Sequence, residues 1–210
     1  MKTPVTAIVE ECIDHLGKNF SDNSLLYFSE SDLQSELFSL LLHELPPETM
    51  IPNISVWGTQ RAPVVRPCIS RTLHTELHLP EGRIDLAVLD FAGVTMSVNS
   101  RGRFGHIQLQ DGYHIFIEVK ASRSNRSQVT SKPAWIKSIR SDIVKLNKYT
   151  HLCFLLCFDF SGILIDKEIE ALKVGANQNV TTRYFVNPRR DQWFDNAKTA
   201  NPSLAESEHS

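Results

Sequence analysis

The feature that most constrains the fold is a nearly continuous apolar run, HLCFLLCFDF, at residues 151–160. An apolar run of this length, bounded by turns, is typical of a β-strand that is covered on both faces. Such a strand requires a sheet with a layer of structure on each side. Because 41% of the 210 residues are hydrophobic, the chain has enough apolar material for one core of this kind. We therefore expect a single α/β domain.

Periodicity along the rest of the chain predicts the other elements. Apolar residues at helical spacing predict four helices, over residues 3–16 (ending near Gly17), from Ser29 or Ser31 to about 45, over 133–149 and over 163–174. Alternating or apolar segments predict strands at 69–79, 83–90, 113–122, 151–160 and 180–186, the first two forming a hairpin. Two further segments are expected to be a protruding hairpin or loop (92–112) and an irregular connection (49–67).

This order predicts a mixed central sheet flanked by helices. Residues 1–28 form an N-terminal helical extension in this interpretation, the core spans about 30–187, and 188–210 form a polar C-terminal tail. Twenty-two Lys and Arg against 24 Asp and Glu exclude a protein that binds polyanions simply by being basic overall. With four cysteines, no CxxC pair, no signal-peptide pattern and no run of about 18 apolar residues, we expect a cytoplasmic protein with reduced thiols and no membrane partner.

Three charged residues fall within the predicted strands. Alternation puts Glu118 and Lys120 on the same face of the strand 113–122, and Asp85 lies in the strand 83–90, opposite in direction to Ile84, Leu86 and Val88. Charged groups are costly to bury without partners, so pairing of the two strands would bring both carboxylates together around a cation. A hard divalent ion such as Mg²⁺ prefers this type of oxygen site, and a nearby lysine can orient water or neutralise charge on a phosphate. The pattern favours phosphodiester hydrolysis.

These residues, Asp85 in GRIDLAV and Glu118-Val119-Lys120 in HIFIEVKAS, resemble the motif of the PD-(D/E)xK nuclease superfamily. The resemblance covers about residues 30–160 and implies a restriction-endonuclease-like αβββαβ core. It also implies that Asp85, Glu118 and the carbonyl of Val119 bind Mg²⁺, with Mn²⁺ as a substitute, and that Lys120 is the catalytic lysine. Many members add an acidic residue from the first core helix, and Glu36 is the candidate for it here. The implied activity is a metal-dependent endodeoxyribonuclease, and the analogy is compatible with a homodimer.

A cationic segment follows the proposed catalytic lysine. Residues 120–148 contain eight basic residues and one acidic residue, Asp142. A segment of this charge suits a phosphate backbone, so we expect nucleic-acid contacts from a set of basic residues, namely Arg123, Arg126, Lys132, Lys137, Arg140 and Lys145. Asp142 and Lys145 can also belong to the site itself, but the sequence does not fix their directions.

Other interpretations of the same residues remain open. The Asp85, Glu118 and Lys120 set can be an internal ion cluster, and the segment 123–148 an ordinary solvated helix face. His74, Glu76 and His78 share one strand face, where a polar surface row is favoured over a zinc site, although Glu76 alone could complete the Mg²⁺ site. Cys153 and Cys157 are expected in the core. The alternative function is a catalytically weak or inactive nuclease-fold subunit that binds nucleic acid within a larger complex; a third is a purely structural cluster.

Overall fold

The structure is a computed structural model that describes residues 5–23, 27, 29–45, 49–57, 63–70, 72–79, 82–89, 94–98, 104–109, 114–125, 128–129, 131–160, 162 and 164–187. For 49–57, 63–70, 94–98, 104–109, 123–125 and 128–129 only the backbone is described. The elements in chain order are α1 (Val5–Asn23), α2 (Glu30–Glu44), β1 (Thr49–Trp57), β2 (Pro63–Ser70), β3 (Leu73–Leu79), β4 (Gly82–Val88), β5 (Val94–Val98), β6 (Phe104–Leu109), β7 (Ile115–Ala121), β8 (Arg123–Asn125), β9 (Gln128–Val129), α3 (Lys132–Leu146), β10 (Leu152–Asp159), α4 (Asp166–Lys173) and β11 (Val180–Val186).

The centre of the fold is a five-stranded mixed sheet in the order β11-β10-β7-β4-β3. Strands β7, β10 and β11 run parallel, whereas β4 is antiparallel to both β7 and β3. β10 lies between two parallel neighbours and is buried on both faces from Cys153 to Asp159. The prediction of a doubly covered strand at 151–160 is therefore confirmed, as are the β3–β4 hairpin and the mixed α/β sheet.

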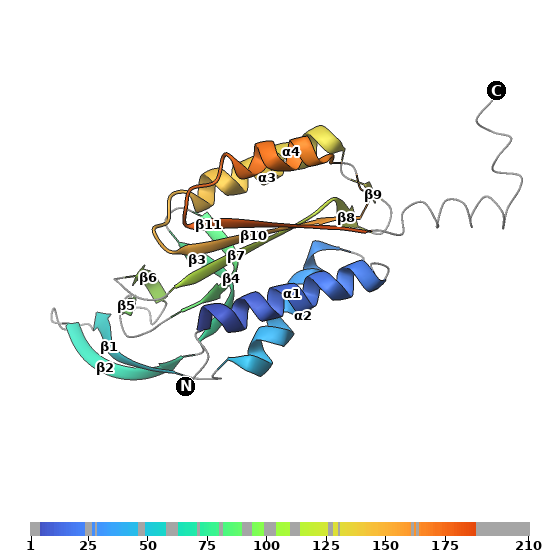
Figure 1. The fold of residues 1–210 in the computed structure, drawn as a ribbon. Coiled ribbons are helices and arrows are strands. Elements are labelled where there is room, and N and C mark those ends of the chain that lie inside the picture. The colour runs from blue at the N-terminus through green and yellow to red at the C-terminus, as the bar shows by residue number, and fades with distance from the viewer. Residues whose placement is uncertain are drawn as a thin grey trace, which may run out of the picture.

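Helices cover both faces of this sheet, with α1 and α2 on one face and α3 and α4 on the other (Figure 1). Each face has its own apolar cluster. Leu86, Ile117 and Leu156 pack with α1 and α2, while Phe116, Leu155 and Trp135 belong to the cluster on the α3 side. Successive residues of β7 thus point to opposite layers, as strand geometry requires. Whether a β7 side chain packs against α1 and α2 or lies on the side of α3 and α4 therefore depends on the sheet face to which it points.

Helix α1 does not end near Gly17, as the sequence predicted, but continues to Asn23. The reason is close packing rather than helix propensity. A Cβ atom at Gly17 would lie 2.1 Å from Cε1 of Phe185 in β11, so glycine is needed there to let the helix approach the sheet. One turn further, Phe20 is fully buried and its ring contacts Phe158 and Phe160 edge to face. This burial stabilises the last turns of the helix.

A second sheet, in the order β2-β1-β5-β6, corrects the prediction of an irregular connection over 49–67. Prolines suggested a loop, but they occupy positions that a sheet tolerates. The β1–β2 register is shifted between Ile51 and Ile54, around Pro52, and Pro67 lies in the edge strand β2. Strands β5 and β6 pair antiparallel, which confirms a hairpin within 92–112. This hairpin joins the second sheet through parallel pairing of β5 with β1.

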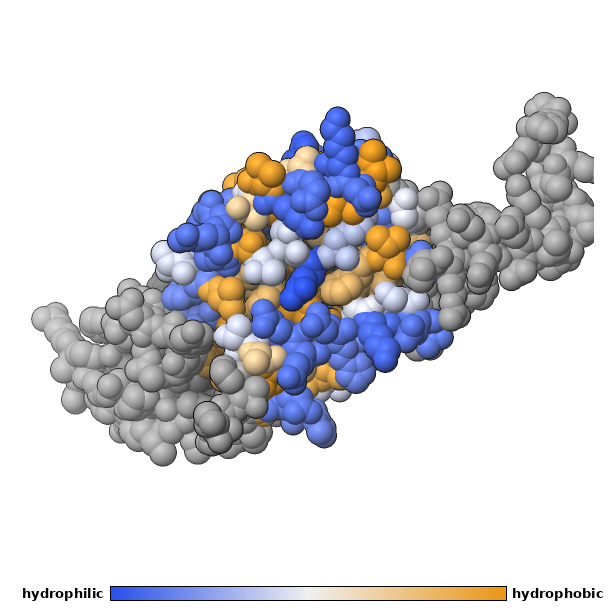
Figure 2. Space-filling model, in the orientation of Figure 1, coloured by the Kyte–Doolittle hydropathy of each residue, from blue (hydrophilic) through white to orange (hydrophobic). Residues whose placement is uncertain are grey.

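The remaining expectations concern the C-terminal half. Helices α3 and α4 and the outer strand β11 are confirmed, and the segment between β7 and α3 contains the short pair β8–β9. The tail 188–210 lies outside the described residues. Within the described part of the chain, no helix combines the length and apolarity that crossing a membrane would need. On the face seen in Figure 2, apolar residues form separate patches among hydrophilic ones.

Candidate active site

Strands β4 and β7 pair over a short stretch and then part. Their register runs from Val88 opposite Ile115 to Leu86 opposite Ile117. β7 continues to Ala121, and on its other side it stays paired with β10 along this whole length. From Val119 onward, the edge of β7 that faces β4 therefore has backbone amides without a strand partner among the described residues. A buried amide of this kind must find another acceptor.

Two carboxylates accept hydrogen bonds from these amides. The amide of Val119 donates to Oδ2 of Asp85 at 2.9 Å, and the amide of Ala121 donates to Oε2 of Glu30 at 3.3 Å. Asp85 comes from β4 just beyond the last β4–β7 pair, and Glu30 is the first residue of α2. The two carboxylates thus replace the backbone carbonyls of β4 as acceptors for the β7 amides beyond the last β4–β7 pair. This arrangement holds both carboxylates against β7.

The neighbouring strand β3 is irregular at the same place. Glu76 has a φ of 54°, which non-glycine residues rarely adopt, and it interrupts the β3–β4 pairing between Thr75 and Leu77. Beyond this point Leu77 and its partner Ile84 pack in the cluster on the α3 side, whereas Leu86 packs on the α1–α2 side. The prediction that Ile84 shares a face with Leu86 and Val88 was therefore wrong, because β4 changes face at Asp85.

On β7, Glu118 and Lys120 project toward the α3 side, and helix α3 supplies two more charged groups. Nζ of Lys120 lies 3.3 Å from Oε1 of Glu30 and 3.5 Å from Oδ2 of Asp142. Nζ of Lys145 lies 2.7 Å from Oε1 of Glu118 and 3.4 Å from Oδ1 of Asp142. Asp142 thus stands between the two lysines. We call the six side chains together the charge cluster: Glu30, Asp85, Glu118, Lys120, Asp142 and Lys145.

The charge cluster is largely removed from water. Glu118 is 1% exposed, Asp85 6%, and the side chains of Lys120 and Lys145 are 18% and 20% exposed. With all groups ionised, four carboxylates against two ammonium groups leave two negative charges in excess. Uncompensated negative charge in a buried site is unfavourable, so the cluster has the electrostatic character of a site for a cation.

The pKa directions reflect this imbalance. Burial, and then the neighbouring Asp85 carboxylate, raise the pKa of Glu118 to about 8 against the lowering effect of Lys145. Burial likewise raises the pKa of Glu30, although Lys120 opposes it. Burial alone would lower the pKa of Lys120, but the carboxylates, led by Glu30 and Asp142, raise it above its usual value. Lys120 is therefore an ammonium group at neutral pH and acts as a donor and a positive charge, not as a base.

The helix carboxylate that reaches this site is Glu30, not the candidate Glu36. Glu36 accepts a hydrogen bond from Nδ2 of Asn19 at 2.8 Å, on the side of α2 that faces α1. Ser29 caps α2 in a capping box with Asp32, which fixes Glu30 in the first turn. Helical spacing carries the signal for Glu30: it precedes the buried Leu33 by three residues, and so lies on the buried stripe of α2.

Asp142 was left without a direction by the sequence, although the same kind of signal exists for it. It follows the buried Ile139 by three residues and the buried Trp135 by seven, which places it on the inner stripe of α3. The buried stripe of α3 thus contains a carboxylate. A polar residue at such a position points to a site rather than to solvent.

The described residues among the predicted nucleic-acid contacts divide between the charge cluster and a groove on the outer side of α3. Lys145 belongs to the charge cluster, and Lys132 forms an ion pair of 2.7 Å with Glu168 of α4. Lys137 and Arg140 are exposed and lie on the opposite side of α3 from Asp142, given 3.6 residues per turn. Together with Lys132, they line a groove of about 450 Å³ between α3 and α4. Of Arg123 only the backbone, in β8, is described, and Arg126 lies outside the described residues.

The row His74, Glu76 and His78 of β3 is mostly exposed. His74 is half-buried, His78 is exposed, and Glu76 forms an ion pair of 2.6 Å with Nε of Arg83 instead of reaching Asp85 or Glu118. Among the residues that the structure describes, no three His, Cys, Asp or Glu side chains are arranged to hold a metal ion as they stand. Cys153 and Cys157 are buried free thiols in β10, which confirms their place in the core.

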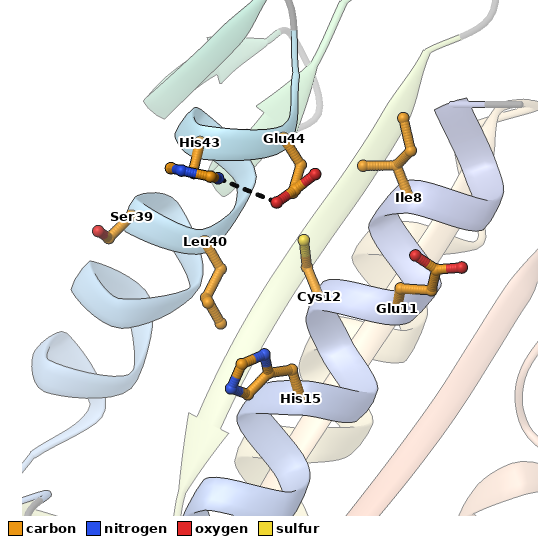
Figure 3. Close-up of a pocket in the computed structure, with 8 residues that line it drawn as sticks. All are labelled: Ile8, Glu11, Cys12, His15, Ser39, Leu40, His43 and Glu44. Atoms are coloured by element: carbon orange, nitrogen blue, oxygen red, sulfur yellow. Dashed lines mark hydrogen bonds and ion pairs between the residues drawn. The ribbon is translucent and has the colours of Figure 1, made fainter. Parts of the chain in front are cut away.

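A separate groove of about 420 Å³ lies between α1 and α2 (Figure 3). Ile8, Cys12 and Leu40 supply its apolar part, and the contact of 2.9 Å between Nδ1 of His43 and Oε1 of Glu44 lies at one end. Burial raises the pKa of the Cys12 thiol, so this cysteine is a poor nucleophile. None of the residues of the charge cluster lines this groove.

No family model, curated protein or solved structure shows significant similarity to this chain. Its function therefore has to be argued from the geometry of the charge cluster.

Proposed function

We propose that this protein is a metal-dependent nuclease that hydrolyses phosphodiester bonds in DNA. The proposed mechanism is that of the PD-(D/E)xK nuclease superfamily, whose motif the sequence resembles. The observation that carries the proposal is the charge cluster, in which Asp85, Glu118 and Lys120 meet at the point where β4 leaves β7. When only the strands of the five-stranded sheet are counted, and β1, β2, β5, β6, β8 and β9 are treated as insertions, the order α2-β3-β4-β7-α3-β10 matches the αβββαβ order that the resemblance implies. This agreement supports the proposal independently of the three residues.

The donor set fits a hard divalent cation such as Mg²⁺ or Mn²⁺. Asp85 and Glu118 would hold the ion, with the backbone carbonyl of Val119 as a third oxygen donor. With all groups ionised, the charge cluster has an excess of two negative charges, and a divalent ion would also displace the proton that the raised pKa of Glu118 keeps there. When bound, the ion supplies Lewis-acid activation of water and neutralises charge on the phosphate.

The residues of the chain have separate tasks in this proposal. The Asp85 carboxylate is held in place by the amide of Val119, so it needs little reorganisation to act as a ligand. Lys120 is held between Glu30 and Asp142 and stays protonated, so its ammonium group can donate to the attacking water or to a non-bridging phosphate oxygen. Donors fixed in a site of low water content stabilise developing negative charge more strongly than in solution.

A nuclease-fold subunit that binds nucleic acid without cutting it is the alternative. It is favoured by one observation: Glu118, a proposed ligand, is already neutralised by Lys145 at 2.7 Å. If this ion pair persists, Glu118 is not available as a ligand, and the site would bind no metal and catalyse nothing. The two functions differ in whether a metal-dependent reaction takes place.

Nicking of supercoiled plasmid in Mg²⁺, Mn²⁺ or EDTA distinguishes them. We expect the wild type to cut only with metal, and Asp85→Ala and Lys120→Ala to be inactive. Lys18→Ala, an exposed lysine of α1 outside both the charge cluster and the predicted nucleic-acid contacts, is the control and should keep cutting. Single-stranded DNA and RNA are tested alongside. Equal inactivity of the wild type and the variants on every substrate would reject the nuclease and leave the binding subunit.

A further inference from the structure

Lys145 has the surroundings of a bound cation. Its Nζ lies 2.7 Å from Oε1 of Glu118, 3.4 Å from Oδ1 of Asp142 and 2.9 Å from the backbone carbonyl of Arg83. Three oxygen atoms from β7, α3 and β4 thus converge on one ammonium group. Two of them are carboxylate oxygens, which are the donors that a divalent ion also prefers.

The fold makes room for this side chain. Gly82, the first residue of β4, has a φ of +141°, and a Cβ atom there would lie 3.2 Å from Cδ of Lys145. The stem of Lys145 therefore passes directly over the glycine to reach Glu118. Glycine at position 82 suits the positive φ, and its missing side chain leaves room for the stem of Lys145.

The two lysines serve different parts of the charge cluster. The ion pairs of Lys120 are with Glu30 and Asp142, whereas Lys145 holds Glu118 and the other oxygen of Asp142. A Mg²⁺ ion binds oxygen at about 2.0–2.1 Å, so it cannot share the Glu118 carboxylate with an ammonium group already at 2.7 Å without strong repulsion. Metal and Lys145 therefore compete for Glu118.

Resting on the nuclease function proposed above, we propose that Lys145 is a built-in counter-cation: its ammonium group occupies the cation position at Glu118 and must move aside for a divalent ion to bind there. The lysine stem is flexible and its side chain is 20% exposed, so it can turn toward solvent. Without metal, the ammonium group of Lys145 offsets part of the negative charge of the charge cluster. The same group lowers the affinity of the cluster for a divalent ion. Lys145 is a residue that regulates metal binding, not a catalytic residue.

Calorimetric titration with Mn²⁺ tests this competition. Lys145→Met removes the charge and keeps the apolar stem over Gly82, and Lys145→Gln removes the charge but keeps a donor for Glu118. We expect both variants to bind Mn²⁺ about 10- to 100-fold more tightly than the wild type, the range of a charge-assisted hydrogen bond. Loss of the ammonium group also makes protonation of Glu118 more favourable, and a proton competes with the metal. A divalent ion carries twice the charge of a proton, so its electrostatic attraction to Glu118 increases about twice as much, and the net affinity for Mn²⁺ rises.

Lys148→Met is the matched control, because Lys148 is exposed just after the same helix and has no role in the charge cluster. Its Mn²⁺ affinity should equal that of the wild type. A second readout is the melting temperature: Mn²⁺ should raise it more in the Lys145 variants than in the wild type. This readout also shows that both variants are folded.

The outcomes separate this inference from the proposed function. If the wild type and both Lys145 variants bind Mn²⁺ with equal affinity, the counter-cation is rejected while a metal-binding site remains. Binding by the variants alone supports the counter-cation and shows that Lys145 blocks the ion in the wild type. If neither the wild type nor the variants bind Mn²⁺, the metal-dependent function and the counter-cation are both rejected.

Discussion

The two sides of strand β7 differ in how their amides are satisfied. Toward β10 the register continues without a break from Ile115 to Ala121, and toward β4 it ends at Ile117. Along the β10 edge, the backbone amides and carbonyls of β7 pair with those of β10, and apolar side chains of β10 are buried on both faces of the sheet. On the second side the carboxylates of Asp85 and Glu30 take over two amides. One strand thus contributes to the core along one edge and to the charge cluster along the other.

The difference teaches how a buried charged site is built at limited cost. Carboxylates that replace carbonyl acceptors in a ladder receive hydrogen bonds that they need in any case. The continuous β7–β10 side supplies the apolar burial that offsets the unfavourable burial of charge on the other side. The following predictions separate the two contributions.

The largest effect is expected on the β10 side. Leu155 is fully buried and lies opposite Glu118 in the β7–β10 register. Leu155→Ala should lower the free energy of unfolding by about 2–5 kcal/mol, because it leaves a cavity in a packed layer. Urea titration measures the change. Val144→Ala, on the exposed side of α3, is the control and should change it by less than about 0.5 kcal/mol. Equal effects of both substitutions would contradict the proposed division.

On the β4 side, Asp85→Ala should lower the free energy of unfolding by less than Leu155→Ala does. It should also abolish all metal-dependent activity. Removing the carboxylate leaves the buried amide of Val119 without its acceptor, which costs about 1–3 kcal/mol. Asp85→Asn keeps an acceptor for this amide and should recover most of the stability without the activity. The same urea titration, with nicking assays in parallel, tests both variants. Full activity of Asp85→Asn would show that the charge of Asp85 is not needed.

Stability in EDTA should also depend on pH through Glu118. Its pKa is raised to about 8 in the folded protein, so between about pH 4.5 and 8 the folded state holds a proton that the unfolded state has lost. The free energy of unfolding should therefore fall as pH rises through this window, by up to about 1.4 kcal/mol per pH unit. Glu118→Gln removes this contribution. Identical pH slopes for the wild type and Glu118→Gln would mean that Glu118 titrates normally.

The smallest effects on stability distinguish the two carboxylates of α2. Glu30→Gln and Glu36→Gln each remove one charge, and each should change stability by less than about 1 kcal/mol. Only Glu30 contacts Lys120 and the open edge of β7, so only Glu30→Gln should slow cleavage, by about tenfold. The cleavage rate of Glu36→Gln should stay within about twofold of the wild type. A slower Glu36→Gln would assign the helix carboxylate to Glu36 after all.

Sequence patterns were most informative where one face of an element is apolar. The doubly covered strand β10, the β3–β4 hairpin and helix α3 follow from periodicity alone. Alternation along β7 also gave the shared face of Glu118 and Lys120. The second sheet was missed because Pro52 and Pro67 resemble loop signals, and a bulge or an edge position is defined only by the neighbouring strands.

The site was predictable only in part, for a related reason. The change of face at Asp85 lies opposite the left-handed backbone of Glu76 in a neighbouring strand, and no local sequence pattern indicates it. The directions of Glu30 and Asp142 could have been found, since both follow the buried stripes of their helices. The ion pair between Lys145 and Glu118 joins residues from α3 and β7, and requires the crossover geometry to be known.

The charge cluster also has a consequence for cooperativity. Lys120 pairs with Glu30 of α2 and with Asp142 of α3, and Lys145 of α3 pairs with Glu118 of β7, so two lysines link three elements. Because separating any of these pairs would leave a buried charge without its partner, α2, β7 and α3 are expected to unfold together at this end of the sheet.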